Sequence, residues 1–332
     1  MIDTGLPPYV YRCVDRSRLV DVFRERWVPL FDWWLPSWLP ANLITLGASA
    51  CMWAVLALEL AASAVPPPLL AIAFVVLFQL FLIYDHADGM HAQRTGTSSP
   101  LGEYLDHALD TANGAITILA AFALVSYGNR LLVFSMLWCW HAAFSATMVD
   151  EKERGELYFE MIGSLEGALI FSAFFLSWLV PSVRAWWLAP LVAGIPAYAL
   201  TVAAGGATTL STVGKSVRRM GRLPKQFAVF LGSSLLMAVL LALGSQPFWI
   251  AVAVLVLYSS DYTARVIGSH VLRHPHPLPD LVAPVVVAAA TATPWRPAWW
   301  GALLATYLAL RAGTGALGVL RPMRSLWRWS NP

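Results

Sequence analysis

Residues 68–110 read PLLAIAFVVLFQLFLIYDHADGMHAQRTGTSSPLGEYLDHALD, and this stretch decides which kind of fold the chain can adopt. Its first seventeen residues carry no charge, a length and composition typical of a membrane-spanning helix. The next twenty-six residues hold five of the nineteen carboxylates of the chain. A membrane-length apolar segment is therefore followed at once by a dense group of acids.

The whole chain has the composition of a membrane protein. Of its 332 residues 58% are hydrophobic and only 12% charged, the mean hydropathy is +0.62, and there are sixteen tryptophans. Soluble domains carry about 25% charged residues. The composition therefore predicts an all-α, polytopic membrane helix bundle rather than a soluble chain with one large core, and no nucleic-acid partner is expected.

The cysteines and the N-terminus add little to this prediction. The three cysteines, Cys13, Cys51 and Cys139, show no CxxC spacing, so neither a disulfide framework nor a zinc site is indicated. The N-terminal residues are mixed in charge and lack a short apolar core with a cleavage site, so no removable signal peptide is expected.

About ten segments are apolar and roughly long enough to cross a bilayer. They are residues 41–63, 68–84, 108–127, 131–149, 163–182, 186–205, 226–244, 247–264, 280–295 and 299–320. With the N-terminus in the cytoplasm, alternation of these spans puts eighteen of the 22 lysines and arginines on the cytoplasmic side. Only Arg130, Arg184 and Arg296 fall on the opposite side, as the positive-inside rule requires. Both termini and the acidic stretch are therefore predicted to be cytoplasmic.

The segment before the first predicted span does not look like a span itself. In residues 17–39 charges alternate with apolar residues, and Trp33, Trp34 and Trp38 follow. This pattern is typical of an amphipathic helix in the membrane interface; a cytoplasmic helix packed on the bundle is the alternative. We therefore divide the chain into an interfacial segment, 1–40, and one membrane domain, 41–325.

The acids fall on two helix faces. Asp85 and Asp88 are three residues apart, and Asp106 and Asp110 are four apart, so each pair shares a face. Ser99 is a suitable N-cap for the second helix, with Pro100 at its first position. The intervening loop reverses the chain, so we expect all four carboxylates to converge at the cytoplasmic edge of the membrane.

Four close carboxylates repel one another and favour bound cations. Oxygen ligands of this kind select Mg²⁺, Mn²⁺ or Ca²⁺, and a pair of such ions can clamp a phosphoryl group during an in-line displacement. Gly89 leaves room for a substrate to approach the backbone beside Asp88. The alternative is an exposed acidic loop without a metal.

The acidic stretch resembles the signature of the CDP-alcohol phosphotransferase family, D-x2-D-G-x2-A-R-x8-G-x3-D-x3-D. The matching residues are Asp85, Asp88, Gly89, Ala92, Gly102, Asp106 and Asp110. The wider match RTGTSSPLGEYLDHALD is similar to the eukaryotic-type choline and ethanolamine phosphotransferase branch. YRCVDRSRL, LPSWLPANLITL and ERGELYFEMIGSLEG are also similar to segments of that branch. One position departs: the expected arginine after Ala92 is Gln93, and Arg94 follows.

This resemblance implies a ten-span fold, a reaction and a set of roles. The 3-hydroxyl of diacylglycerol, or of an alkyl-acyl analogue, would attack the β-phosphorus of CDP-choline or CDP-ethanolamine and release CMP. The four aspartates would hold two Mg²⁺ or Mn²⁺ ions, with Asp106 bridging. Asn42, Gly89 and Ala92 would border the nucleotide. Gln93, Arg94 and Gly102 complete the implied substrate-binding set, and a homodimer is expected.

Two residues compete for the role of general base. The resemblance offers either Asp110 or His107 assisted by Glu166. A histidine is a plausible base near neutrality, whereas a carboxylate tied to a metal is a poorer one, so His107 with Glu166 is favoured and Asp110 is kept as a metal ligand. The alternative role for His107 is to orient an aspartate. Glu166 also stands out because ionisable residues inside spans are usually functional.

Other functions remain open at this stage. A relative that uses CDP-diacylglycerol and a polyol phosphate is the nearest alternative, but such enzymes are typically shorter. A divalent-cation transporter would place its acids near mid-membrane. An inactive scaffold is the third alternative. The residue composition favours a bacterial inner membrane over an endoplasmic reticulum membrane, and the sequence does not choose between choline and ethanolamine.

Overall fold

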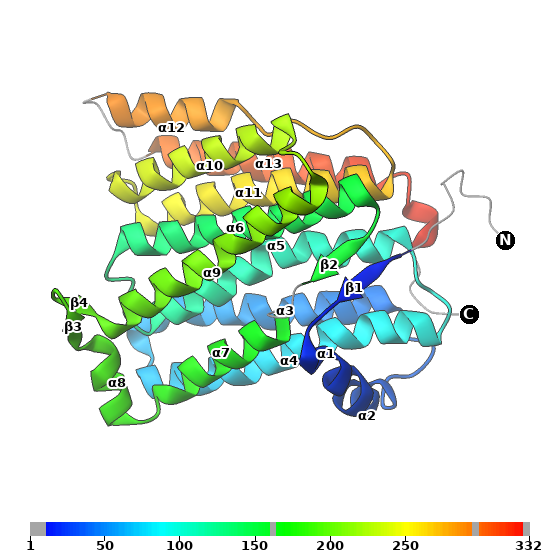
Figure 1. The fold of residues 1–332 in the computed structure, drawn as a ribbon, viewed down its shortest axis with the longest axis horizontal. Coiled ribbons are helices and arrows are strands. Elements are labelled where there is room, and N and C mark those ends of the chain that lie inside the picture. Colours follow the sequence, from blue (N-terminus) through cyan, green and yellow to red (C-terminus); the bar gives the residue numbers. More distant parts are fainter. Residues whose placement is uncertain (1–10, 160–163, 294–298, 328–332) are drawn as a thin grey trace. The chain divides into compact units, whose positions relative to one another are not determined.

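The computed structural model describes residues 11–159, 164–293 and 299–327, and most of them are helical (Figure 1). The chain divides into two compact units. The first contains the residues up to Gly128, Tyr158–Tyr198 and the residues from Met323; the second contains Asn129–Leu157 and Ala199–Pro322. Every site residue predicted from the sequence lies in the first unit.

The first unit begins with a short strand and a helical run that precede its long helices. Strand β1 (Cys13–Asp15) pairs with β2 (Leu157–Phe159), and the Arg16 N–H donates to the Phe159 carbonyl (3.2 Å). Helices α1 (Arg18–Val22) and α2 (Val28–Asp32) are joined by a π-helical turn, η1 (Phe23–Trp27). Residues 18–32 are therefore continuously helical, whereas residues 33–39 of the predicted helix form turns instead.

The long helices of the first unit are α3 (Ala41–Leu60), α4 (Pro67–Arg94), α5 (Pro100–Ala123) and α7 (Ser164–Ser177). A 3₁₀ turn, η2 (Ala62–Ala64), links α3 to α4. The four long helices lie side by side (Figure 1). Their buried faces form a core of alanine, larger aliphatic and aromatic side chains. In that core, Phe74 of α4 lies against Phe175 of α7, with ring centroids 5.6 Å apart.

The first unit ends in a bent helix pair, a small hairpin and a C-terminal turn. Helix α8 (Pro181–Leu188) follows α7 at an angle of 108°. Strands β3 (Pro190–Val192) and β4 (Ile195–Pro196) form an antiparallel hairpin. The 3₁₀ turn η3 (Arg324–Leu326) lies near the end of the chain.

The second unit is also helical. Its helices are α6 (Arg130–Arg154), α9 (Ala197–Met220), α10 (Lys225–Leu243), α11 (Phe248–Val271), α12 (Val282–Ala292) and α13 (Trp299–Leu320). Phe230 of α10 stacks on Tyr262 of α11, with centroids 4.2 Å apart. Asp261 of α11 accepts hydrogen bonds from Arg265 (2.8 Å) and from Arg311 of α13 (3.0 Å), which join these two helices inside the unit.

The prediction of an all-helical polytopic membrane protein is confirmed. Among the described residues, six helices have the length and hydropathy of a membrane span: α3, α4, α6, α10, α11 and α13. The bent pair α7–α8 is a seventh if it counts as one broken span. Each of the ten predicted segments overlaps a helix. Helices α5 and α9 are long but carry more polar residues, and α12, with 11 residues, is shorter than a span requires.

The predicted span 186–205 is wrong in its boundaries. Residues 190–196 form the β3–β4 hairpin, and the helix begins only at Ala197 and continues to Met220. Ala193 and Gly194 both have positive φ (49° and 79°), as a tight two-residue hairpin turn requires. Pro190 and Pro196 lack the N–H that a helix interior needs, so an apolar composition alone does not make this segment helical.

Candidate active site

The first pair of acids lies near the C-terminal end of α4. Asp88 is buried, with 6% of its surface exposed, and Thr45 of α3 donates a hydrogen bond to its Oδ2. Asp85 is half-buried, and its neighbour His86 makes a hydrogen bond through Nδ1 to the Leu82 carbonyl (3.0 Å). Helix α3 thus holds Asp88 directly, which fixes one carboxylate of the pair.

The second pair lies in the first half of α5. Ser99 caps this helix by accepting a hydrogen bond from the Gly102 N–H (3.2 Å), with Pro100 following it, so the predicted helix start is confirmed. Asn113 donates to Asp110 Oδ1 (3.3 Å) and to Ser49 of α3 (3.1 Å). A buried amide therefore ties Asp110 to α3.

The two pairs converge as the spacing predicted. Each of the four aspartates is close enough to repel at least one other. Nδ1 of His107 lies 3.4 Å from Asp106 Oδ2. Asp106, His107 and Asp110 each offer a ligand atom, and these atoms lie within 4.8 Å of one another.

This cluster has the chemistry of a divalent-cation site. The four aspartates repel one another when they are ionised. A cation bound among them would remove this repulsion. The donors are carboxylate oxygens with one imidazole beside them, which suits Mg²⁺ or Mn²⁺. The residues present therefore fit a bound divalent metal.

The two candidate partners in proton transfer lie in different surroundings. His107 is buried within α5, and the Tyr11 ring lies 6.4 Å from its own. Glu166 is in the first turn of α7, where its Oε1 accepts a hydrogen bond from Ser17 (2.7 Å). The bond that positions Glu166 thus comes from the interfacial segment, and the pairing of Glu166 with His107 stays a prediction.

A small pocket lies at the N-terminal ends of α3 and α5. Its volume is about 110 Å³, and it is lined by Pro40, Ala41, Asn42, Gly96, Thr97, Ser98, Ser99 and Leu326. A methyl group at Gly102 would lie 3.4 Å from Asn42 Oδ1, so this glycine lets the Asn42 amide pack against the start of α5. The pocket presents an amide, hydroxyls and helix N-termini, groups that suit a polar or anionic ligand.

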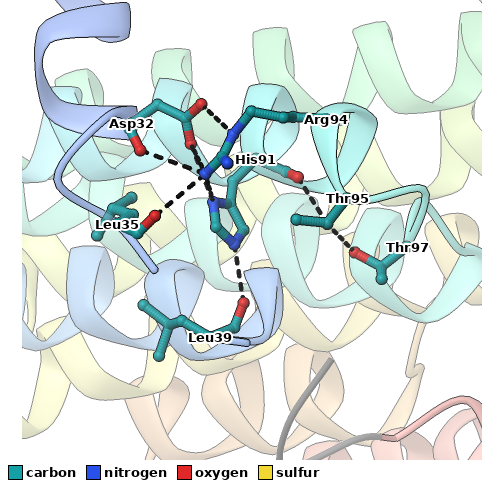
Figure 2. A network of polar contacts seen from close by, with 7 residues as sticks. All are labelled: Asp32, Leu35, Leu39, His91, Arg94, Thr95 and Thr97. Carbon is teal, nitrogen blue, oxygen red and sulfur yellow. Dashed lines mark hydrogen bonds and ion pairs between the residues drawn. The ribbon is translucent and has the colours of Figure 1, made fainter. Parts of the chain in front are cut away.

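The remaining signature residues lie along the end of α4. Gly89 is exposed, and a methyl group there would meet no described atom within 4 Å. Ala92 is half-buried and Gln93 is exposed. Arg94 instead directs its guanidinium to Asp32 of α2, through Nε–Oδ2 (2.6 Å) and Nη2–Oδ1 (3.1 Å) contacts (Figure 2). The arginine next to the expected position is thus engaged by the interfacial segment.

Several supporting residues were not found from the sequence: Ser17, Thr45, Ser49 and Asn113. A signal for two of them exists. Asn42, Thr45 and Ser49 recur at helical spacing on an otherwise apolar span, which marks one polar face of α3. Ser17 could not be found this way, because its partner Glu166 is 149 residues away in the chain.

A polytopic helical membrane protein that gathers four carboxylates from two long helices has the general form of a membrane enzyme with a divalent-cation site. The chain belongs to the CDP-alcohol phosphatidyltransferase family, whose model matches residues 38–209, just over half of the chain. The matched range includes all four aspartates, so the predicted family is confirmed.

Curated relatives agree with this assignment. The chain is 27% identical over 179 residues to cholinephosphotransferase 1 of Saccharomyces cerevisiae, covering 52% of this chain and 45% of that protein. It is 30% identical over 210 residues to choline/ethanolaminephosphotransferase 1 of Arabidopsis thaliana, covering 58% and 50%. It is also 30% identical over 139 residues to a CDP-diacylglycerol–serine O-phosphatidyltransferase of Encephalitozoon cuniculi, covering 40% and 35%. The chain thus spans half or less of the length of these relatives.

Proposed function

We propose that this protein transfers phosphocholine or phosphoethanolamine from the CDP-alcohol to the 3-hydroxyl of diacylglycerol or an alkyl-acylglycerol, forming a phospholipid and CMP. The observation that carries the proposal is the convergence of Asp85, Asp88, Asp106 and Asp110 within the family signature. The similarity to proteins named cholinephosphotransferase and choline/ethanolaminephosphotransferase supports the choice of donor.

Different residues of the first unit would serve different parts of this reaction. The four aspartates would hold two Mg²⁺ or Mn²⁺ ions, which supply charge neutralisation for the phosphates and the leaving CMP. Asn42 and the polar loop at residues 96–99 line the pocket in which part of the nucleotide would sit. Gly89 leaves open space beside Asp88 for the reacting group.

His107 is the base in this proposal. It accepts the proton of the lipid hydroxyl as the new bond forms between that oxygen and the β-phosphorus, while the bond from this phosphorus to the oxygen of CMP breaks. Glu166 assists His107, and Asp106, 3.4 Å from His107 Nδ1, orients its ring. Asp110 is the alternative base, and its hydrogen bond from Asn113 holds it in place for either role.

A second candidate function follows from one comparison. The similarity to a CDP-diacylglycerol–serine O-phosphatidyltransferase favours a reaction in which CDP-diacylglycerol is the donor and a soluble alcohol, such as a polyol phosphate, the acceptor. Both reactions break the same bond to CMP, so the acidic cluster does not separate them. A cation transporter and an inactive scaffold are the alternatives without turnover.

A transfer assay on the full chain in detergent separates these functions. Purified protein with Mg²⁺ or Mn²⁺ receives diacylglycerol with CDP-choline or CDP-ethanolamine, or CDP-diacylglycerol with serine or a polyol phosphate. We expect CMP release and a new phospholipid only with the first set of substrates. Activity confined to CDP-diacylglycerol would support the second candidate, and CMP release from no donor would refute both.

We further propose the membrane arrangement and assembly that suit this reaction. The active site and both termini lie in the cytoplasm, where a water-soluble CDP-alcohol can reach the acids. The bacterial inner membrane is the expected location, or the endoplasmic reticulum membrane in a eukaryote. The protein is expected to act as a homodimer.

A further inference from the structure

Residues 17–39 of the interfacial segment touch the candidate active site at three separate points. Ser17 donates a hydrogen bond to Glu166 (2.7 Å). The Phe23 ring meets the His86 ring edge-on, with centroids 5.1 Å apart. Asp32 binds both His91 and Arg94 at the end of α4. The segment is thus attached to α7 and to the helix that carries Asp85 and Asp88.

The third attachment is a closed polar network (Figure 2). Arg94 makes a bidentate contact with the Asp32 carboxylate. Its Nη2 also donates to the carbonyls of Asp32 (3.3 Å) and Leu35 (3.1 Å). Its guanidinium therefore both pairs with the acid and caps the C-terminal end of α2. We call the side chains of Asp32, His91 and Arg94 the clamp.

His91 joins this network to the turn that precedes α3. The ring is fully buried, and Nε2 donates to the Leu39 carbonyl (2.8 Å) because a carbonyl can only accept. Nδ1 lies 2.9 Å from Asp32 Oδ1 and 3.0 Å from Arg94 Nη2, so it either donates to the carboxylate or accepts from the guanidinium. Both ends of residues 32–39 are thereby fixed to α4.

The part of the interfacial segment that follows Asp32 turns its aromatic side chains outward. Trp33 and Trp34 are 86% and 87% exposed, and Trp38 is 60% exposed. Tryptophan side chains with this exposure suit the headgroup region of a bilayer, where an apolar ring with one polar group is most stable. The clamp thus connects a lipid-facing surface to the end of the helix that carries two of the four acids.

We propose that Asp32, His91 and Arg94 are positioning residues that fix the depth of the tryptophan-bearing segment relative to the acidic cluster and thereby govern use of the membrane-borne acceptor. The acceptor hydroxyl must reach the acids from the lipid phase, so its approach depends on how the interfacial segment is held. Arg94, committed to Asp32 and to two carbonyls, does not serve as a phosphate ligand. This inference rests on the proposed function.

Steady-state kinetics of Asp32→Ala, Arg94→Ala and the double variant test the clamp. In mixed micelles we expect each single variant to raise the apparent KM for diacylglycerol by about tenfold, because small misplacements near a site cost this much or more. The KM for the CDP-alcohol stays unchanged. The effects of the two single variants should be less than additive in the double variant, since both remove the ion pair between Asp32 and Arg94.

Conservative and control variants separate positioning from simple loss of folding. Asp32→Asn keeps the shape of the side chain and Arg94→Lys keeps its positive charge, while each loses part of the network, so both should show smaller rises in the same KM. Arg26→Ala removes an exposed charge from the same segment and should change neither KM. A rise in the donor KM for Arg94→Ala but not for Asp32→Ala would show that Arg94 binds the donor, which overturns the proposal. Lower thermal stability with both KM values unchanged would overturn it too.

A second measurement does not need turnover. A nitroxide at Trp34→Cys, with Cys13, Cys51 and Cys139 replaced, reports the depth of the segment in liposomes through its collisions with oxygen and with a water-soluble nickel complex. We expect Asp32→Ala to change this depth and Arg26→Ala to leave it alone. An unchanged depth in Asp32→Ala overturns the clamp, whereas absence of CMP release by the wild type refutes only the proposed function.

Discussion

At the scale of single residues, Asp106 and His107 are neighbours with separable roles. We expect Asp106→Ala to lose both Mn²⁺ binding and turnover, because it removes a carboxylate from the centre of the acidic cluster. We expect His107→Ala to keep Mn²⁺ binding and to lose turnover by about 10²–10⁴-fold, the usual contribution of a general base. Mn²⁺ titration by calorimetry and CMP release measure the two effects.

The control for this pair is His274→Ala, which removes an exposed loop histidine and should change neither quantity. Normal turnover in His107→Ala would place the base elsewhere, with Asp110 the next candidate. Loss of Mn²⁺ binding in His107→Ala would instead make the imidazole a metal ligand together with Asp106 and Asp110, whose ligand atoms lie within 4.8 Å of its own.

The contribution of Thr45 to the site can be measured as a change in Mn²⁺ affinity. Its hydroxyl donates to Asp88, so Thr45→Val leaves a buried carboxylate without that donor. Residues that support metal ligands typically contribute 10–100-fold to affinity or activity. We therefore expect Mn²⁺ affinity to fall by about tenfold in Thr45→Val and to be restored in Thr45→Ser. Thr117→Val, which removes a buried hydroxyl that donates to the Asn113 carbonyl, is the control and should leave affinity unchanged.

At the scale of elements, the attachment of α2 to α4 is sensitive to pH. Burial by itself raises the pKa of Asp32, but hydrogen bonds and positive charge from Arg94 and His91 outweigh it and hold this pKa below its ordinary value. Asp32 therefore contributes stability above its unfolded pKa of about 3.9, and that contribution is lost as the pH falls through the lower folded pKa.

The comparison of wild type with Asp32→Asn isolates this contribution, since other carboxylates titrate in both proteins. We expect the wild type to have the higher Tm near neutrality and the difference to shrink below about pH 4. Thermal unfolding in detergent, followed by circular dichroism between pH 3 and 7, measures it. A difference in Tm that stays constant over this range would contradict the lowered pKa of Asp32.

The second unit contains its own arginine cap. Arg130, at the start of α6, donates to the carbonyl of Leu241 in the last turn of α10 and to that of Gln246 in the following loop (2.8 Å each). Its guanidinium lies over the Phe134 ring. Hydrogen bonds to a charged donor contribute about 1.5–3 kcal/mol. We expect Arg130→Met to lower the free energy of unfolding by about this amount and Tm by a few degrees. Arg184→Met, which removes a charge from α8, should change Tm much less.

The features that could be predicted are those set by residues close together in the sequence. The start of α5 follows from Ser99 and Pro100, and the shared faces of the acids follow from their spacing, because both depend on neighbours in the chain. The hairpin at residues 190–196 was missed because its apolar residues resemble a span, while Ala193 and Gly194 set the turn. A hydropathy average over about twenty residues, the length of a span, gives no information on the φ angles of two residues.

At the scale of the whole molecule, contacts between distant parts of the chain were the ones that could not be predicted. Asp32 and Arg94 are 62 residues apart, and Ser17 and Glu166 are 149 apart. An amphipathic helix with exposed tryptophans does not reveal which of its few polar side chains turns inward. The four aspartates were found because a fixed spacing and a family signature mark them, whereas the residues that hold them are marked by neither.

The orientation in the membrane is a property of the whole chain and remains a prediction. The distribution of lysine and arginine places the loop before α10 in the cytoplasm and the loop after it on the opposite side. Leu223 and Ser245 lie in these two loops, and both are exposed. In a chain with its three cysteines replaced, Leu223→Cys should react with a membrane-impermeant maleimide only after the membrane is opened, whereas Ser245→Cys should react in intact cells. Both positions flank α10, so labelling of both in intact cells would refute the prediction that α10 spans the membrane. Labelling of Leu223→Cys alone in intact cells would show that the active site lies on the opposite side of the membrane from the one predicted.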